Sequence, residues 1–343
     1  MSLYVQVKEQ VVKQILSGAY ERGKPFPTEY ELCERYGVSR VTVRKALDAL
    51  KQDGVIVSIQ GQGTKLAESL GGFPGSLEII ALIAEVHNPF FASFMEQFER
   101  AAEKNGSLVL FKQDFQGDAF QAEDLFFRLI QKNIRNLVLW PNSDRIDFAL
   151  LRRLRTVGAN LVIFDQPFPS DSADIVCVDH QHAVVELFDE MRKSHEGNIV
   201  FIGYEGIALP SEQLREQAFI EKSGGGEIYR IPWGRDIEQS TSDLLDRLLE
   251  QGVLPAGLLC GNGPIGLAAA KHLQRLRLKD VPLGVIDYLP EMENFTIAAY
   301  QQPMNLLAEM AYRRLVEQSE SGERWKATVC QLRGEVVRFN GGR

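Results

Sequence analysis

A run of polar residues near the N-terminus has the side chains and the spacing that bind DNA. Residues 39–44 read Ser-Arg-Val-Thr-Val-Arg, and apolar residues recur at helical spacing on the other side of the stretch 39–50. Hydroxyl and guanidinium groups in the first turns of such a helix can contact base edges and phosphates in the major groove. The side chains that we expect to contact duplex DNA are Ser39, Arg40, Thr42, Arg44 and Lys45.

Flanking elements would position this helix as the second half of a helix-turn-helix. Thr28 and Glu31 have the spacing of a capping box, which predicts a helix start, and Gly37 supplies the tight turn that follows. Beyond the recognition helix, two short strands enclose a glycine-containing tip that can enter the minor groove. The tip residues are Gln60, Gly61, Gln62 and Gly63. This order of elements favours a winged helix-turn-helix over a purely structural helix pair.

Two charged residues before the recognition helix each allow two interpretations. Glu29 can cap its helix or orient an arginine, and we favour the capping role. Arg35 can contact a DNA phosphate or remain a solvated surface charge, and the residues alone do not separate the two.

The head resembles the GntR family of bacterial transcription regulators. The resemblance rests on residues 26–32, 37–47 and 61–64, and it covers residues 3–67. It implies that residues 39–44 contact bases or phosphates, with the tip at the minor groove.

The charge of the 343-residue chain is unevenly distributed. Residues 1–70 hold 10 Lys/Arg and 8 Asp/Glu, whereas the remainder holds 28 and 38, so a mildly basic head precedes an acidic body. The apolar runs are too short to span a membrane, and charges occupy the place of a secretory signal. The four cysteines are scattered and form no C-x-x-C pair. We therefore expect a cytoplasmic protein without a membrane segment, a disulfide framework or structural zinc.

The body alternates apolar strands with amphipathic helices in two series, at about residues 78–164 and 183–286. This pattern predicts an α/β fold, with two lobes that each contain a parallel sheet covered on both faces. The glycine-rich stretch 68–76 has the composition of a linker. The predicted domains are a winged helix-turn-helix at 1–67 and a two-lobe effector-binding and dimerisation domain at 77–343.

Polar and aromatic side chains follow the carboxyl ends of the predicted strands, where ligands bind in open α/β sheets. Any one of them could instead cap a helix, but the convergence of the set from both lobes favours a ligand site. Carboxylates, amides and an arginine hold sugar hydroxyls, and flat rings stack on the apolar face of a sugar. Because acidic candidates outnumber basic ones, a neutral sugar is favoured over a phosphorylated one. The candidates are Asn88, Asp114, Trp140, Asp165, Arg215, Trp233, Asn262, Asp287 and Gln302.

The body resembles the LacI/GalR effector domain, itself similar to periplasmic sugar-binding proteins, over about residues 77–339. The runs that carry the resemblance lie at 88–106, 162–165, 197–203, 257–262, 285–287 and 301–303. It implies that Phe91 and Trp233 stack on a sugar. The hydroxyl-binding residues that it implies are Asp165, Arg215, Asn262, Asp287 and Gln302. The chain departs from that family at Gly263, where an aspartate is usual, at Val285, where a glycine is usual, and at Ala218. It also has the GntR-type head in place of that family's own helix-turn-helix and hinge helix.

The enzymatic motifs that we considered do not fit. Residues 179–182 read Asp-His-Gln-His, but this spacing on a loop makes a poor metal chelate, and the glycines at 224–226 do not match a nucleotide-binding motif. No nucleophile elbow is present. Some GntR heads precede an aminotransferase-like body, but nothing here supplies its lysine Schiff base. We predict no catalytic residues, no bound metal and no cofactor.

The leading hypothesis is a transcription repressor that responds to a ligand. A homodimer would bind an operator with two half-sites, spaced by about one helical turn or a multiple of it. A small sugar or polyol between the lobes would rearrange the heads and release the DNA. The alternative is a sugar-binding or sugar-processing protein whose N-terminal domain is a relic or only an assembly module. The retention of Arg40, Thr42 and Arg44 on the reading face argues against it.

Overall fold

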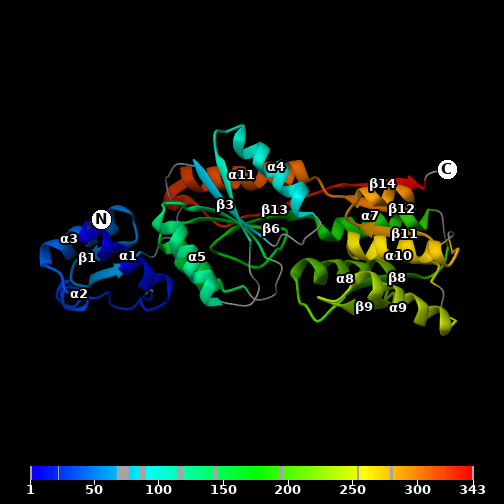
Figure 1. Cartoon of the computed structure of the whole chain (residues 1–343), viewed down its shortest axis with the longest axis horizontal. Coiled ribbons are helices and arrows are strands. Elements are labelled where there is room, and N and C mark those ends of the chain that lie inside the picture. Colours follow the sequence, from blue (N-terminus) through cyan, green and yellow to red (C-terminus); the bar gives the residue numbers. More distant parts are fainter. Residues whose placement is uncertain are drawn as a thin grey trace.

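The computed structural model shows an elongated molecule, with the N-terminal head at one end and two α/β lobes in succession after it (Figure 1). It describes residues 2–21, 23–67, 77–84, 90–113, 119–141, 146–193, 196–252, 255–278 and 281–341. The predicted linker at 68–76, as well as Asn88 and Asp114, lies outside the described residues.

The head has the predicted winged helix-turn-helix order. Its elements are α1 (Leu3–Leu16), α2 (Glu29–Tyr36), α3 (Arg40–Gln52), β1 (Ile56–Ile59) and β2 (Gly63–Leu66). The predicted capping box starts α2, because the Thr28 hydroxyl accepts the Glu31 N–H at 3.3 Å and the Glu31 carboxylate accepts the Thr28 N–H at 2.8 Å. Gly37 ends α2 in the left-handed conformation, with φ 63°, which a side chain would disfavour.

The N-terminal lobe contains a parallel sheet with helices on both faces. Its strand order is β13-β7-β6-β5-β3-β4. Helices α4 and α11 cover one face, and α5 and α6 cover the other. The bounds are β3 Ile79–Ala84, α4 Phe91–Glu103, β4 Leu108–Gln113, α5 Ala119–Gln131, β5 Asn136–Trp140, α6 Phe148–Thr156, β6 Asn160–Phe164, β7 Asp174–Val178, α11 Met304–Ser321 and β13 Val329–Leu332.

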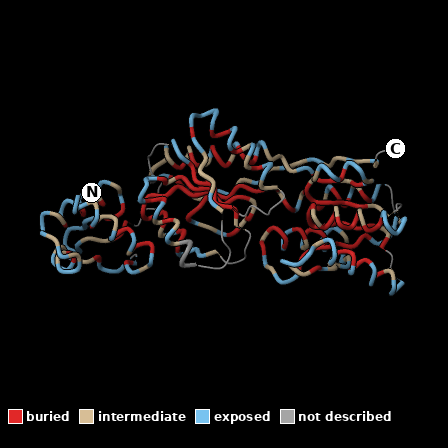
Figure 2. The backbone as a smooth tube through the Cα atoms, in the orientation of Figure 1, coloured by how far each residue is buried: buried red, intermediate tan, exposed pale blue. Residues whose placement is uncertain are grey.

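The C-terminal lobe repeats this layered plan, with strand order β14-β12-β11-β10-β8-β9 and only β14 antiparallel to its neighbour among the described strands. Helices α7 and α8 cover one face, and α9 and α10 cover the other. The bounds are α7 His180–Arg192, β8 Ile199–Glu205, α8 Pro210–Ser223, β9 Ile228–Pro232, α9 Ile237–Glu250, β10 Gly257–Cys260, α10 Gly263–Arg275, β11 Leu283–Ile286, β12 Thr296–Gln301 and β14 Glu335–Asn340. Figure 2 shows the buried residues concentrated along the strands of both lobes.

The two lobes are not successive segments of the chain, and this differs from the predicted pair of series. The chain runs through the C-terminal lobe as far as β12 and then returns to the N-terminal lobe, where it forms α11 and β13. It finally crosses back to the C-terminal lobe and forms β14. The crossing segments bind one another, since the Asp179 N–H donates to the Leu332 carbonyl at 2.8 Å and the Gly334 N–H donates to the Tyr300 hydroxyl at 2.7 Å. A Cβ on Gly334 would clash with the Gln301 carbonyl oxygen, so this crossing requires glycine.

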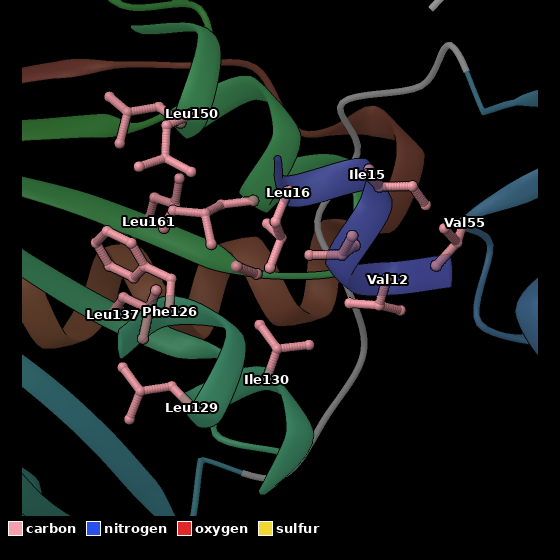
Figure 3. Packing of buried hydrophobic residues seen from close by; sticks show 14 of the residues in the cluster. Val12, Ile15, Leu16, Val55, Phe126, Leu129, Ile130, Leu137, Leu150 and Leu161 are labelled. Atoms are coloured by element: carbon pink, nitrogen blue, oxygen red, sulfur yellow. The ribbon is translucent and has the colours of Figure 1, made fainter. Parts of the chain in front are cut away.

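The head packs directly on the N-terminal lobe. Leu16 and Val12 of α1 face Ile130 and Leu129 of α5 within one continuous apolar cluster (Figure 3). Polar contacts border this cluster: the Gln131 side-chain amide donates to the Glu9 carboxylate at 3.0 Å, and Arg135 lies 3.9 Å from Asp53. We call this packing the head–lobe contact. It joins the head to the lobe that carries β6.

Candidate functional site

The start of α3 presents the predicted DNA-contacting side chains to solvent. Ser39 caps the helix, because its hydroxyl accepts the Thr42 N–H at 3.3 Å, and the two hydroxyl oxygens lie 2.9 Å apart. The apolar side of the helix is buried. The side chains of Arg40 and Arg44 are 69% and 63% exposed, and Lys45 is exposed beside them. The helix therefore offers hydroxyl and guanidinium groups on one accessible face.

Glu29 orients the arginines, and the favoured prediction that it caps α2 is not what the structure shows. Its carboxylate accepts from Arg44 Nε at 3.0 and 3.2 Å and lies 3.5 Å from Arg40 Nε. The hydrogen bond from Arg44 lowers the pKa of Glu29. Capping is performed by Thr28 with Glu31 instead. The role of Glu29 depends on the packing of α2 beside α3, which sequence spacing within α2 does not show.

Arg35 and the tip of the wing have contacts within the head. The Arg35 guanidinium donates to the Tyr20 hydroxyl at 2.6 Å and lies over the Tyr20 ring, which gives this residue a structural role. Gly61 and Gly63 both have φ 80°, as the tight turn between β1 and β2 requires. Gln60 and Gln62 are exposed at this tip, and the Gln62 side-chain carbonyl accepts from Lys65 at 2.7 Å.

Polar side chains that are buried, or half-buried in the case of Asp165, gather where the two lobes meet, and we call them the interlobe cluster. Its members are Asp165, Gln166, His180, Glu212, Arg215 and Asp287. At its centre, Arg215 Nη1 donates to the Gly261 carbonyl at 2.7 Å and lies 3.4 Å from a Glu212 carboxylate oxygen. Arg215 Nε donates to His180 Nδ1 at 3.2 Å, and His180 Nε2 lies 3.2 Å from the Asp165 carbonyl oxygen. This chain of contacts connects α8 of one lobe to the end of β6 in the other.

Asp165 and Asp287 occupy equivalent places in the two lobes. Each directly follows an inner strand, β6 or β11, and each has a left-handed backbone, with φ 67° and 80°. The Asp165 carboxylate accepts from the Trp140 indole at 3.3 Å and from the Gln166 amide at 3.1 Å. The Asp287 carboxylate accepts from the Gln302 amide. An unusual backbone at the end of each inner strand thus directs a carboxylate toward the junction of the lobes.

Burial strongly shifts the pKa values of the ionisable groups in the interlobe cluster. It raises the pKa of Glu212 to about 7 and that of Asp287 to about 6, although the positive charge of Arg215 opposes both changes. Burial also raises the pKa of Asp165. The pKa of His180 falls well below its usual value through burial and the nearby Arg215 charge, so its ring is neutral. Because Arg215 donates to Nδ1, the ring proton resides on Nε2, which donates to the Asp165 carbonyl.

Two predicted residues beside the interlobe cluster, Trp140 and Asn262, already have partners within the protein. Trp140 is 4% exposed and packs edge-on against Phe94 and Phe164, so its indole N–H and not its ring face serves the cluster. Asn262 caps α10, since its side-chain oxygen accepts the Ile265 N–H at 3.1 Å. Asn262 thus has the capping role that the sequence left open for any single candidate, and Trp140 contributes an N–H to the cluster.

The two predicted stacking rings also have partners within the protein. The Phe91 ring packs against Phe111, with centroids 4.7 Å apart, and the Trp233 ring packs edge-on against Tyr204 at 4.8 Å. The neighbouring Phe90 reaches across to the C-terminal lobe, where a Cβ on Gly263 would lie 3.1 Å from its ring. Gly263 therefore leaves room for both Phe90 and Leu289.

Sequence reasoning missed four residues of this region: Phe90, Gln166, His180 and Glu212. Gln166 bridges the lobes, because its side-chain oxygen accepts the Ser211 N–H at 3.3 Å. Glu212 lies three residues before Arg215 on α8, and this spacing on a helix places both side chains on one face. That spacing was a usable signal for Glu212.

Among the described residues, no group of three or more His, Cys, Asp and Glu side chains could hold a metal ion. Across the same residues, no helix has the length and apolarity needed to cross a membrane.

The head matches a known family of DNA-binding domains. Residues 3–66 match the model of bacterial regulatory proteins of the gntR family. Over 62 residues the chain is 47% identical to the probable fructoselysine utilization operon transcriptional repressor of Escherichia coli K12, covering 18% of this chain and 26% of that protein. It is 36% identical over 81 residues to the transcriptional repressor NagR of Bacillus subtilis, covering 22% and 33%. The chain thus spans about a quarter to a third of these relatives.

The body matches solved structures of another class. A LacI transcriptional regulator from a Rhodococcus species aligns with TM-score 0.64 at 18% identity, covering 77% of this chain and 98% of that one. The Cra regulator of Pseudomonas putida, solved with fructose 1-phosphate, aligns with TM-score 0.64 at 19% identity, covering 77% and 99%. GanP, a glucose-galactose binding protein of Geobacillus stearothermophilus, aligns with TM-score 0.65 at 14% identity, covering 77% and 98%. The chain therefore joins a GntR-type DNA-binding head to a body with the two-lobe fold of LacI-type regulators and periplasmic binding proteins.

Proposed function

We propose that this protein is a transcription repressor that binds operator DNA through its head and is released by a small sugar or polyol. The observation that carries the proposal is a buried polar cluster, contributed by both lobes, on the same chain as an exposed recognition helix. No catalytic step is part of the proposal, and a cytoplasmic location follows from its operator partner.

The DNA-binding half of the proposal rests on the exposed start of α3. A homodimer would place one α3 helix in each of two successive major grooves, with Arg40 and Arg44 toward the bases and phosphates. The glycine turn of the wing would approach the adjacent minor groove. Glu29 would hold both guanidinium groups in a common orientation before DNA is bound.

The effector half of the proposal rests on the interlobe cluster and the crossing segments. A ligand between the lobes gains contacts from both of them, and it therefore favours the arrangement in which both sets of contacts are made. Since the head packs on the N-terminal lobe through α1 and α5, a rotation of that lobe moves the head with it. Within a dimer, this movement would change the spacing between the recognition helices and weaken operator binding.

The proteins similar to this chain support a sugar-responsive repressor. Proteins similar to the head include the fructoselysine repressor, and structures similar to the body include Cra with fructose 1-phosphate and the trehalose repressor of Escherichia coli. The combination of the two domains resembles the arabinose repressor, and this finer resemblance stays a prediction.

The DNA half is tested by selecting operator sequences from random duplex DNA with the full chain, and then measuring the affinity of an Arg44→Ala variant. Loss of a base-contacting arginine is expected to weaken operator binding by about 1–3 kcal/mol. Arg100→Ala is the matched control, because Arg100 is an exposed arginine on α4 in a similar ion pair. If the head is only an assembly module, the full chain selects no sequence, and neither variant changes DNA affinity.

The effector half is tested by thermal unfolding of the full chain with a panel of sugars and polyols, followed by an operator-release assay with each compound that raises the midpoint. Asp165→Asn is expected to abolish both the midpoint change and the release. Asp171→Asn is its control, since Asp171 pairs with Arg152 at the surface. If Asp165→Asn still responds fully, the assignment of the ligand site to the interlobe cluster is wrong.

A further inference from the structure

The interlobe cluster has an excess of negative charge. Among the described residues of the cluster, three carboxylates (Asp165, Glu212 and Asp287) face one guanidinium, that of Arg215, and the His180 ring is neutral. Arg215 is already engaged by the Gly261 carbonyl at 2.7 Å and by His180 at 3.2 Å. One guanidinium cannot neutralise three ionised carboxylates, and burial raises the pKa of each of them.

Glu212 is the least satisfied of these carboxylates. Its Oε1 atom lies 3.4 Å from Arg215 Nη1, at the long limit of a hydrogen bond. Its Oε2 atom is buried and has no hydrogen-bond partner among the described residues. Asp165 and Asp287, in contrast, each accept from at least one side-chain amide. A buried carboxylate oxygen without a donor is unfavourable, so this site lacks a group that donates to Glu212.

The groups that act on Glu212 come from several elements. Arg215 and Glu216 lie on its own helix, and Tyr204, Asp165 and Asp287 act from β8 and from the ends of β6 and β11. Asp165, Asp287 and Glu216 raise the pKa of Glu212, whereas Tyr204 stays neutral because burial raises its own pKa. Apart from Arg215, the charges near Glu212 are therefore negative. The missing donor is thus favoured if it carries a positive charge.

We propose that the effector carries a protonated amine that binds Glu212, so that the repressor responds to an amino sugar or a similar cationic polyol. This inference rests on the proposed function and specifies its ligand. An ammonium group supplies hydrogen-bond donors and positive charge at the same atom. A neutral hydroxyl supplies the donor without the charge. A phosphate group adds negative charge beside three carboxylates, and is therefore excluded.

The proposal has a proton signature that a neutral ligand lacks. In the free protein at neutral pH, a fraction of the Glu212 side chains retain a proton, because burial raises the pKa to about 7. A bound ammonium group stabilises the ionised carboxylate, so the proton is released to the buffer when the ligand binds. A neutral sugar leaves the protonation of Glu212 nearly unchanged, and a phosphorylated sugar would cause proton uptake.

The test is isothermal titration calorimetry of the full chain at pH 7, in two buffers with different ionisation enthalpies. The probes are glucosamine, galactosamine and mannosamine, each beside its parent hexose and the 6-phosphate of that hexose. For the amino sugar that fits, we expect at least tenfold tighter binding than for its parent, with release of a fraction of a proton. If a parent hexose or a hexose 6-phosphate binds tightly and the amino sugar binds no more tightly, this inference is overturned. The proposed function would then still hold. If no probe binds, the amine inference fails, and the proposed effector class fails with it for these sugar cores.

A Glu212→Gln variant separates the charge from the shape of the side chain. We expect it to lose the preference for the amine over the parent hexose and to lose the proton release. Glu216→Gln is the control on the same helix, because Glu216 pairs with Arg230 outside the cluster at 2.6 Å. An Asp287→Asn variant provides a second measurement if Glu212→Gln does not fold. An unchanged amine preference in folded Glu212→Gln contradicts the proposal. In Asp287→Asn, which removes a carboxylate that raises the pKa of Glu212, unchanged proton release contradicts it.

Discussion

Replacing Glu212 with glutamine is expected to change how the stability of the C-terminal lobe depends on pH. The ordinary pKa of a glutamate is 4.5, whereas burial raises that of Glu212 to about 7 in the folded protein. Between these two values the folded state holds a proton that the unfolded state has lost. Folding stability contributed by this group is therefore fully present below pH 4.5 and is lost as the pH rises toward 7.

The size of this effect follows from the displacement of the pKa. At about 1.4 kcal/mol for each pH unit, a pKa displaced from 4.5 to about 7 costs about 3 kcal/mol of stability by pH 8. Glutamine has the shape of the protonated acid and no ionisable proton. We therefore expect Glu212→Gln to match the wild type near pH 4.5 and to exceed it by about 3 kcal/mol at pH 8.

The assay is urea unfolding of the full chain at pH 5, 6, 7 and 8, followed by hydrogen exchange of the amides of α8 and β8. Glu216→Gln, whose partner Arg230 lies outside the cluster, is expected to parallel the wild type over this range. If the difference between Glu212→Gln and the wild type is the same at pH 5 and at pH 8, the ionisation of Glu212 is not coupled to folding. The electrostatic description of the interlobe cluster would then be wrong.

Other predictions follow from single contacts. Glu29→Gln removes the shared partner of Arg40 and Arg44 and a negative charge near the phosphates, so the ratio of operator to random-DNA affinity should fall about two- to fivefold in competition assays at fixed salt; an unchanged ratio would mean that the pairing does not orient the arginines. Gly334→Ala places a Cβ against the Gln301 carbonyl, and urea unfolding should show a loss of about 1–3 kcal/mol; full stability would contradict the described crossing. Ile130→Ala opens the head–lobe contact at a side chain that is 5% exposed, at a cost of about 2–5 kcal/mol. Calorimetry should then show the head melting earlier, and operator binding should persist while effector release weakens; an unchanged release would show that the contact does not transmit the signal.

Local signals in the sequence were enough to predict the helices, the turn and the wing of the head. A capping box, a left-handed glycine and a glycine-containing turn act over three or four residues, so their spacing alone predicts where helices and strands begin and end. The alternation of apolar strands and helices likewise predicted two parallel-sheet lobes. Asp165 and Asp287 were predicted as site candidates because each follows an inner parallel strand, and ligands of open α/β sheets bind beyond the carboxyl ends of such strands.

Tertiary packing decided what the local signals could not. Glu29 binds Arg44 fifteen residues away, and His180 binds Arg215 from a different helix, so neither role is visible from spacing along one element. The return of α11 and β13 to the first lobe also depends on contacts between distant segments. Sequence by itself therefore determined the DNA-binding domain and the strand ends that could hold a ligand. The structure decided which side chains meet, which are already paired, and that Glu212 lacks a partner, because these properties depend on burial and on distances between residues far apart in the chain.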